Sequence, residues 1–326
     1  MNGLGKLKIF CLSFVFLMSS ILVSSAASSS FDQWLQKFQI KALENGVSQN
    51  TLNTAFNGLS VNNRVIELDG KQPEKTITFV DYRKRILSDT RIKKGREMLI
   101  KHRDILERVS KDYGVQPEYI VALWGVETSF GGYTGNFSTV RSLATLAYDG
   151  RRASFFEKEL LNALQIIEAG HISASEMTGS WAGALGQNQF MPSSFLAYAQ
   201  DYNGNGRKNI WTELEDVFAS SANYLSQSGW HGDELWGRQV LIPDSVREEM
   251  IGRENKKTLQ EWSNIGVTKL NGEPLPNVEG MKGGLVAPDG IDGPVYLVYN
   301  NYDVLMKWNR STYFATSVGL LANRIK

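Results

Sequence analysis

Cysteine is nearly absent from this chain of 326 residues, and its only example is Cys11. Cys11 falls in an N-terminal segment where Lys6 and Lys8 precede an apolar run from Ile9 to Val23, with small residues after it. This order predicts a cleaved signal peptide over residues 1–27. Because Cys11 stands in the middle of the run and not after its end, we do not expect a lipid anchor. The mature chain would then have no disulfide, no thiol nucleophile and no thiolate metal site.

An anchor that stays in the membrane is the alternative for this segment. The apolar run is short for a transmembrane helix and is interrupted by Ser13, Ser19 and Ser20. These features favour cleavage and export.

Histidine is also scarce, since only His102, His171 and His231 are present. The chain contains neither a Gly-x-Ser-x-Gly elbow nor a His-Glu-x-x-His pair. These absences argue against a serine hydrolase and against a zinc hydrolase. The net charge is +1, so no strongly basic surface is expected and nucleic acid is not a predicted partner.

One carboxylate, Glu127, ends an otherwise apolar stretch from Tyr119 to Gly132. Pro117 suits a first helical position and Gly131-Gly132 a stop, so the stretch predicts a helix buried on all sides. Burial penalises the charged form of a carboxylate and raises its pKa, as a general acid requires. The alternative is a structural Glu that pairs with a buried Arg or caps a helix.

A second run, Met177 to Pro192, mixes small residues with polar ones. Ser180, Gln187 and Gln189 stand among aromatics, a mixture that suits sugar hydroxyls and ring faces. A tight helix-packing corner would use the same small residues, and this alternative stays open.

A third run, Asp201 to Asn209, matches the first half of an EF-hand loop. Its twelfth position is Thr212 instead of a bidentate Glu, so Glu213, Glu215 or Asp216 would have to close a calcium site. Because two early oxygens are neutral amides, any affinity should be weak to moderate. A plain Asn/Gly turn is the alternative.

The pattern along the chain predicts a mainly helical (α+β) protein. Hydrophobic content of 42% and charged content of 21% are those of a soluble globular protein. We expect an N-terminal helical domain over 28–103, a catalytic core over 104–235 and 300–326, and a small β-rich insert over 236–299, where turns alternate with short apolar runs.

Three motifs together resemble the lytic murein transglycosylase B family, glycoside hydrolase family 103. They are Gly125–Gly131, Gly183–Ser194 and Trp308-Asn309-Arg310-Ser311, and they fall in the family's order. The similarity runs from about Phe31 to Ile325, which is nearly the whole mature chain.

The resemblance implies a lysozyme-like helical core and non-hydrolytic cleavage of the MurNAc–GlcNAc β-1,4 bond of peptidoglycan, leaving 1,6-anhydro-MurNAc ends. Glu127 is then the single acid/base. The implied substrate-binding residues are Ser180, Gln189, Phe190, Trp308 and Asn309. The implied calcium ligands are Asp201, Asn203, Asn205, Arg207 and Asp216, with no organic cofactor. We expect a periplasmic monomer that binds glycan strands and associates with cell-wall machinery.

A single carboxylate departs from the usual pair of a glycosidase. Asp149, Glu157 and Glu159 sit on visibly polar segments, so only Glu127 has a suitable setting. One acid/base suffices if the substrate's 2-acetamido group stabilises the cation and its C6 hydroxyl closes the ring. The alternatives are a hydrolytic lysozyme-like muramidase and a peptidoglycan-binding scaffold that has lost catalysis.

Overall fold

The structure is a computed structural model that describes residues 19–71 and 77–326, with side chains from Ser30 onward. The expected signal peptide lies outside the described residues as far as Met18, and its remainder starts helix α1 (Ser19–Glu44). Within the described part of the chain, no helix is long and apolar enough to cross a membrane.

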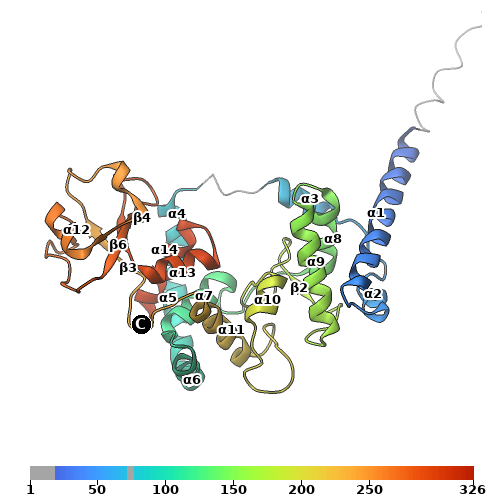
Figure 1. Ribbon diagram of the computed structural model, residues 1–326, viewed down its shortest axis with the longest axis horizontal. Helices are drawn as coiled ribbons and strands as arrows, with labels where there is room; N and C mark the ends of the chain where they lie inside the picture. The colour runs from blue at the N-terminus through green and yellow to red at the C-terminus, as the bar shows by residue number, and fades with distance from the viewer. Residues whose placement is uncertain (1–18, 72–76) are drawn as a thin grey trace, which may run out of the picture.

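One end of the elongated molecule is helical (Figure 1). Here α2 (Gln49–Ala55) and α3 (Asn63–Gly70) pack on the pair α8 (Thr139–Asp149) and α9 (Ala153–Glu168). Phe31 and Trp34 of α1 contact the ring of Tyr148 at 5.2 and 6.1 Å between centroids.

A buried carboxylate joins α3 to the turn between α8 and α9. Asp69 forms ion pairs of 2.6 Å with Arg151 and 3.1 Å with Arg152, although both arginines are exposed. The double arginine therefore holds this end of the molecule together.

The centre of the molecule is built around α7 (Pro117–Thr128). It packs against α5 (Asp89–Lys101), α6 (Arg103–Tyr113), α11 (Leu214–Gln227) and α14 (Thr312–Ile325). Helix α4 (Phe79–Ile86) lies on α14, and α13 (Asn300–Trp308) contacts α11 and α14. The apolar sequence of α7 is thus explained, because neighbours cover it on every side.

Short elements link this centre to the helical end. Strands β1 (Phe137–Ser138) and β2 (Thr178–Gly179) form an antiparallel pair, and α10 (Pro192–Tyr198) packs on α9 and α11.

The opposite end carries a five-stranded antiparallel sheet in the order β4-β6-β7-β3-β5. Its strands are β3 (Gly237–Leu241), β4 (Gly252–Thr258), β5 (Thr268–Lys269), β6 (Lys282–Val286) and β7 (Val295–Val298), with η1 (Glu248–Met250) and α12 (Leu259–Ile265) beside them. Trp262, Leu285 and Leu297 are fully buried in a separate small core there. The predicted mainly helical fold with a small β-rich part is confirmed.

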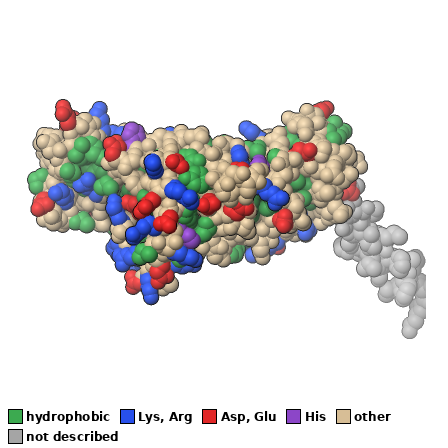
Figure 2. Space-filling model, turned by 90° about the horizontal axis from the view of Figure 1, so that it is seen from below, with side chains coloured by type: hydrophobic (Ala, Val, Ile, Leu, Met, Phe, Trp, Pro, Cys, Tyr) green, Lys and Arg blue, Asp and Glu red, His purple; other side chains and the backbone are tan. Residues whose placement is uncertain are grey.

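Residues 28–103 do not form one compact unit. Helices α1–α3 pack at the α8–α9 end, whereas α4 and α5 pack on α7 and α14 (Figure 1). On the face shown in Figure 2, acidic and basic side chains lie close together, in keeping with the net charge of +1.

Candidate active site

Glu127 lies one residue before the end of α7, where the buried helix reaches the surface. The chain reverses at once, because Ser129 and Phe130 adopt left-handed φ values of 52° and 61°. Among the described residues, the only other non-glycine with a positive φ is Gln189, at 51°. Such strained backbone is often held at functional sites, and here all three residues belong to the two segments around Glu127.

The Glu127 carboxylate has one direct polar partner. The indole Nε1 of Trp308, at the end of α13, donates a 2.7 Å hydrogen bond to Glu127 Oε1. Burial raises the pKa of Glu127 to about 7, and the Trp308 hydrogen bond opposes part of that rise by favouring the ionised form. Glu127 therefore holds a proton near neutral pH and can also release it.

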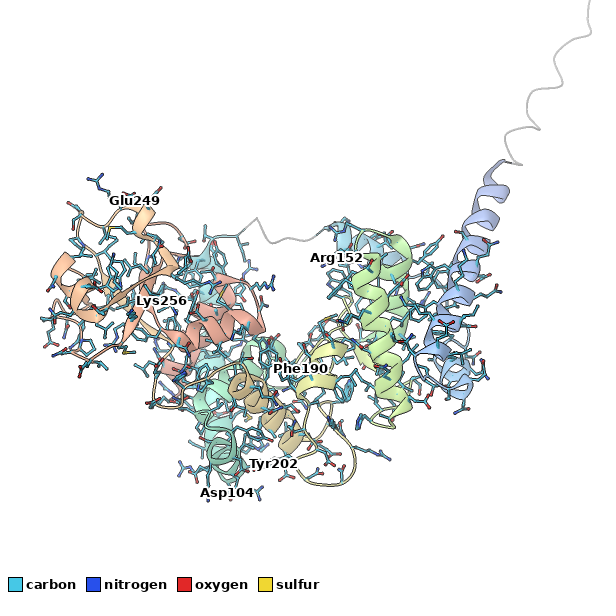
Figure 3. All side chains as sticks on the ribbon, viewed as in Figure 1. Asp104, Arg152, Phe190, Tyr202, Glu249 and Lys256 are labelled. Carbon is cyan, nitrogen blue, oxygen red and sulfur yellow. The ribbon has the colours of Figure 1, made fainter. Side chains whose placement is uncertain are left out.

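An aromatic wall extends from this hydrogen bond. The ring of Trp308 lies 5.2 Å from Phe190 and 4.8 Å from Tyr224, and Tyr224 lies 4.5 Å from Tyr198. Figure 3 labels Phe190 near the middle of the molecule, between the α8–α9 end and the central helices. Phe190 is buried, whereas the other three rings are half-buried and offer apolar surface to sugar ring faces next to the carboxylate.

The loop that carries Phe190 is fixed to α7 by Gln187. Its side chain accepts a hydrogen bond from Trp124 Nε1 at 2.8 Å and donates to the Trp211 carbonyl at 2.9 Å. Gly186 adopts a φ of 57°, and a Cβ there would lie 2.6 Å from the Ile210 carbonyl oxygen. The small residues of the second run therefore serve close backbone packing, and the buried Gln187 amide fixes the loop in place.

Ser180 and Gln189 lie in this loop, and each makes local hydrogen bonds. Ser180 Oγ accepts the Ala184 N–H at 3.0 Å, which leaves its own O–H as a donor. Gln189 Nε2 donates to the carbonyls of Thr134 and Gly186, so its Oε1 stays an acceptor. Both residues are half-buried.

Asn309 follows Trp308 and is exposed. Its Oδ1 accepts the Ser311 N–H at 3.1 Å, which leaves the amide NH₂ as a donor. The structure thus joins Glu127, Trp308 and Phe190 in one chain of contacts and places Asn309 directly beside Trp308.

A neighbour of Glu127 and a neighbour of Ser129 come from α4 and α5, where the sequence shows only a charged amphipathic pattern. Burial raises the pKa of Tyr82, and the negative charge of Glu127 raises it further. Arg91 Nη2 donates a 3.2 Å hydrogen bond to Ser129 Oγ. No local sequence signal marks these residues, because only tertiary packing brings α4 and α5 to the end of α7.

Other carboxylates considered as a second catalytic group are committed elsewhere or exposed. Glu159 accepts the N–H and Oγ–H of Ser193, and Glu157 pairs with Lys41 at 2.8 Å. Asp149 is exposed. Asp289 accepts hydrogen bonds from the N–H groups of Phe79 and Val80 at the start of α4.

The Asp201 loop folds on itself through oxygen acceptors. Asp201 accepts the N–H groups of Asn205 and Gly206, and Asn205 Oδ1 accepts the Arg207 N–H. Glu213 accepts the side-chain amides of Asn203, Asn205 and Asn209.

Asp216 is fully buried below the loop, and its two oxygens accept the N–H groups of Tyr202 and Asn209. Apart from Asp201 within the loop, the carboxylate that faces the loop side chains is thus Glu213. Within the described residues, no group of three or more His, Cys, Asp or Glu side chains is arranged to hold a metal ion.

A central helix that ends in a proton-holding carboxylate beneath an aromatic wall places the protein among the lysozyme-like enzymes that cleave glycan strands. Residues 30–323 match the family described as transglycosylase SLT domain, and the chain belongs to this family. It is a lytic murein transglycosylase, an enzyme that acts on peptidoglycan.

Individual relatives agree with this assignment. Membrane-bound lytic murein transglycosylase B of Escherichia coli (strain K12) is 32% identical over 251 residues, which cover 76% of this chain and 67% of that protein. SltB3 from Pseudomonas aeruginosa, solved in complex with NAG-anhNAM-pentapeptide, is 41% identical with a TM-score of 0.87, over 90% of this chain and 78% of that one. Slt35 from Escherichia coli, solved in complex with calcium, is 26% identical with a TM-score of 0.77, over 91% and 93% of the two chains.

Proposed function

We propose that Glu127 is the single acid/base of a lytic transglycosylase that cleaves the MurNAc–GlcNAc β-1,4 bond and leaves a 1,6-anhydro-MurNAc end. The observation that carries this proposal is the pKa of about 7 of a carboxylate held by Trp308. A group with a pKa near the working pH can serve first as acid and then as base.

The reaction needs two proton transfers at the same carboxyl group. Protonated Glu127 first gives its proton to the oxygen of the leaving GlcNAc, and the glycosidic bond breaks. The 2-acetamido group of MurNAc stabilises the positive charge that develops at C1. The ionised Glu127 then takes the proton of the C6 hydroxyl as that oxygen bonds to C1, which restores the enzyme.

Trp308 has a defined part in this cycle. Its N–H stabilises the ionised form of Glu127, which is the form that accepts the second proton. A donor aimed at a charge that develops during the reaction contributes more than one that binds the neutral ground state.

The absence of a second base supports ring closure over hydrolysis. Among the described residues, no other carboxylate contributes to the raised pKa of Glu127. An inverting glycosidase would need a further carboxylate to activate water, and a retaining one would need a carboxylate nucleophile.

We also propose substrate contacts on both sides of Glu127. The half-buried ring of Trp308, supported by the buried Phe190, would pack on sugar rings. Ser180, Gln189 and Asn309 would meet hydroxyl and acetamido groups with the donors and acceptors left free in the structure.

A weak calcium site in the Asp201 loop is part of the proposal. The hard oxygens of Asp201, Asn203 and Asn205, with the Arg207 carbonyl and the Glu213 carboxylate, suit calcium. We assign the closing role to Glu213 because its carboxylate faces the side chains of Asn203 and Asn205, whereas Asp216 is fully buried below the loop. Bound calcium would stabilise the loop.

Export fits the same function. The N-terminal pattern of the sequence and a substrate that forms the cell wall together favour a periplasmic enzyme released by signal cleavage. We propose that it works there as a monomer, in contact with cell-wall machinery.

The test of the catalytic assignment is Glu127→Gln acting on purified sacculi. Gln keeps the size of the side chain but can neither donate nor accept the proton, so release of soluble fragments should fall at least ~10²-fold. Circular dichroism and melting would show that the fold is kept. Activity within a few-fold of the unmodified chain would remove Glu127 from its role.

A further inference from the structure

A cavity lies outside the group of residues around Glu127. It measures about 910 Å³ and is bounded by α2, by the connection from α9 to β2, and by the loop that follows Asp201. Its size falls within the range of small-molecule sites. None of Glu127, Trp308, Phe190, Ser180 or Gln189 lines it.

The cavity wall is rich in neutral polar groups. The residues Asn50, Thr54, Thr134, Ser173, Asn209 and Thr212 all line it. Hydroxyl and amide groups can both donate and accept hydrogen bonds, as sugar hydroxyls and acetamido groups require.

One aromatic ring stands among these polar groups. Trp211 lines the cavity, and its Nε1 donates a 3.2 Å hydrogen bond to the Thr178 carbonyl. Phe195 packs on it at 5.6 Å between ring centroids. The ring is therefore already fixed in place, and an aromatic ring among hydroxyls and amides suits the apolar face of a pyranose.

His171 adds an oriented donor. Its Nδ1 accepts the backbone N–H of Lys208 at 3.2 Å, so in the neutral imidazole the proton is on Nε2. Burial lowers the pKa of His171, which favours that neutral form.

The charges at the cavity nearly cancel. Glu176 and Arg207 line it with opposite signs, and His171 is the remaining titratable group. A wall without net charge favours a neutral ligand over a phosphate or an acidic peptide.

We propose that this cavity is a second glycan-binding site, which takes N-acetylated sugar units of a neutral saccharide away from the bond that Glu127 cleaves. The inference rests on the proposed function, because the ligand is a strand of the same chemistry as the substrate. Binding at two places on one polymer raises the effective concentration of the substrate at the catalytic site.

Two tryptophans allow the sites to be followed separately. The indole N–H signals of Trp211 and Trp308 in nitrogen-15 NMR spectra report on the cavity and on the catalytic site. The protein would be the full mature chain carrying Glu127→Gln, and the ligand would be chitotetraose, a soluble β-1,4-linked N-acetylglucosamine oligomer. We expect both signals to shift during the titration.

The cavity is then blocked by a large side chain introduced on α2. Thr54 is exposed and lines the cavity, whereas its neighbour Asn53 is exposed and does not. In Thr54→Trp the Trp211 signal should stay fixed while Trp308 still shifts, and in the matched control Asn53→Trp both should shift. A second block from the facing wall, Ser175→Trp, should repeat the result if Thr54→Trp folds poorly.

The outcomes separate this inference from the proposed function. A Trp211 signal that does not move while Trp308 saturates would overturn the second site and leave the first intact. A Trp211 shift that persists unchanged in both blocking variants would also overturn it. If neither tryptophan moved, the glycan-binding function itself would be contradicted.

Discussion

At the scale of single residues, the account depends on how one carboxylate keeps its proton. Burial raises the pKa of Glu127 and the Trp308 N–H restrains that rise. Both effects come from partners far away in the sequence. A substitution at position 308 should therefore change the pKa of Glu127.

Trp308→Phe should move the pH dependence of cleavage. Phe keeps most of the ring that packs on Phe190 but cannot donate to Glu127 Oε1, so the pKa of Glu127 should rise. In the proposed mechanism protonated Glu127 starts the reaction, so kcat/KM on a soluble glycan should fall above that pKa. The fall should shift to higher pH in the variant.

The matched control for this change is Trp230→Phe, which removes an indole hydrogen bond to Gln116 away from the site. It should leave the pH at which kcat/KM falls unchanged. An identical profile for Trp308→Phe and the unmodified chain would mean that the Trp308 hydrogen bond does not tune Glu127.

The same pKa predicts how stability changes with pH. Since the pKa of Glu127 is raised from 4.5 to about 7, the folded chain binds more protons than the unfolded chain between these values. Stability therefore falls as pH rises through this window, and Glu127→Gln should remove that loss.

We expect Glu127→Gln to melt a few degrees higher than the unmodified chain at pH 8, for a gain on the order of 1–3 kcal/mol. At pH 4.5 we expect the variant and the unmodified chain to melt at the same temperature. Exposed Glu107→Gln serves as the control and should show no such pH-dependent gain. If Glu127→Gln were less stable than the unmodified chain at pH 8, ionised Glu127 would not destabilise the fold.

At the scale of elements, the sequence predicts best what depends on local pattern. The all-round apolar run of α7 marks a buried helix and singles out Glu127 without any tertiary knowledge. Strand β4 was not predicted, because its charged residues Arg253–Lys257 show no apolar alternation and it pairs with β6 at one edge of the sheet.

In the candidate site too, the sequence predicts some residues and misses others. The resemblance to a known family assigned Trp308 and Phe190 to the substrate site, and the structure joins them to Glu127. Tyr82 and Arg91 were missed because a charged amphipathic helix has the same sequence pattern whether it meets solvent or packs beside the end of α7.

Calcium should act on the Asp201 loop alone. We expect millimolar calcium to raise the melting temperature modestly, since the loop offers only Asp201 and Glu213 as facing carboxylates. Glu213→Gln should abolish the increment. A melting temperature indifferent to calcium and to chelator would favour a plain turn closed by Glu213 and its amide partners.

At the scale of the whole molecule, the residues proposed to form the catalytic site come from both parts of the chain that flank the β-rich end. Glu127 belongs to α7 and Trp308 to α13, and residues 237–298 form the sheet between them in the sequence (Figure 1). The site is complete only when the chain returns from the sheet and packs α13 and α14 on the centre.

The most direct test of the account is the chemistry of the product ends. Sacculi would be digested in heavy-oxygen water and the fragments analysed by mass spectrometry. With Glu127 proposed as the only catalytic carboxylate among the residues that the structure describes, the new MurNAc ends should carry no heavy oxygen and be lighter by one water than lysozyme products. Heavy oxygen in the reducing ends of the main product would contradict the account and show that the enzyme is a hydrolase.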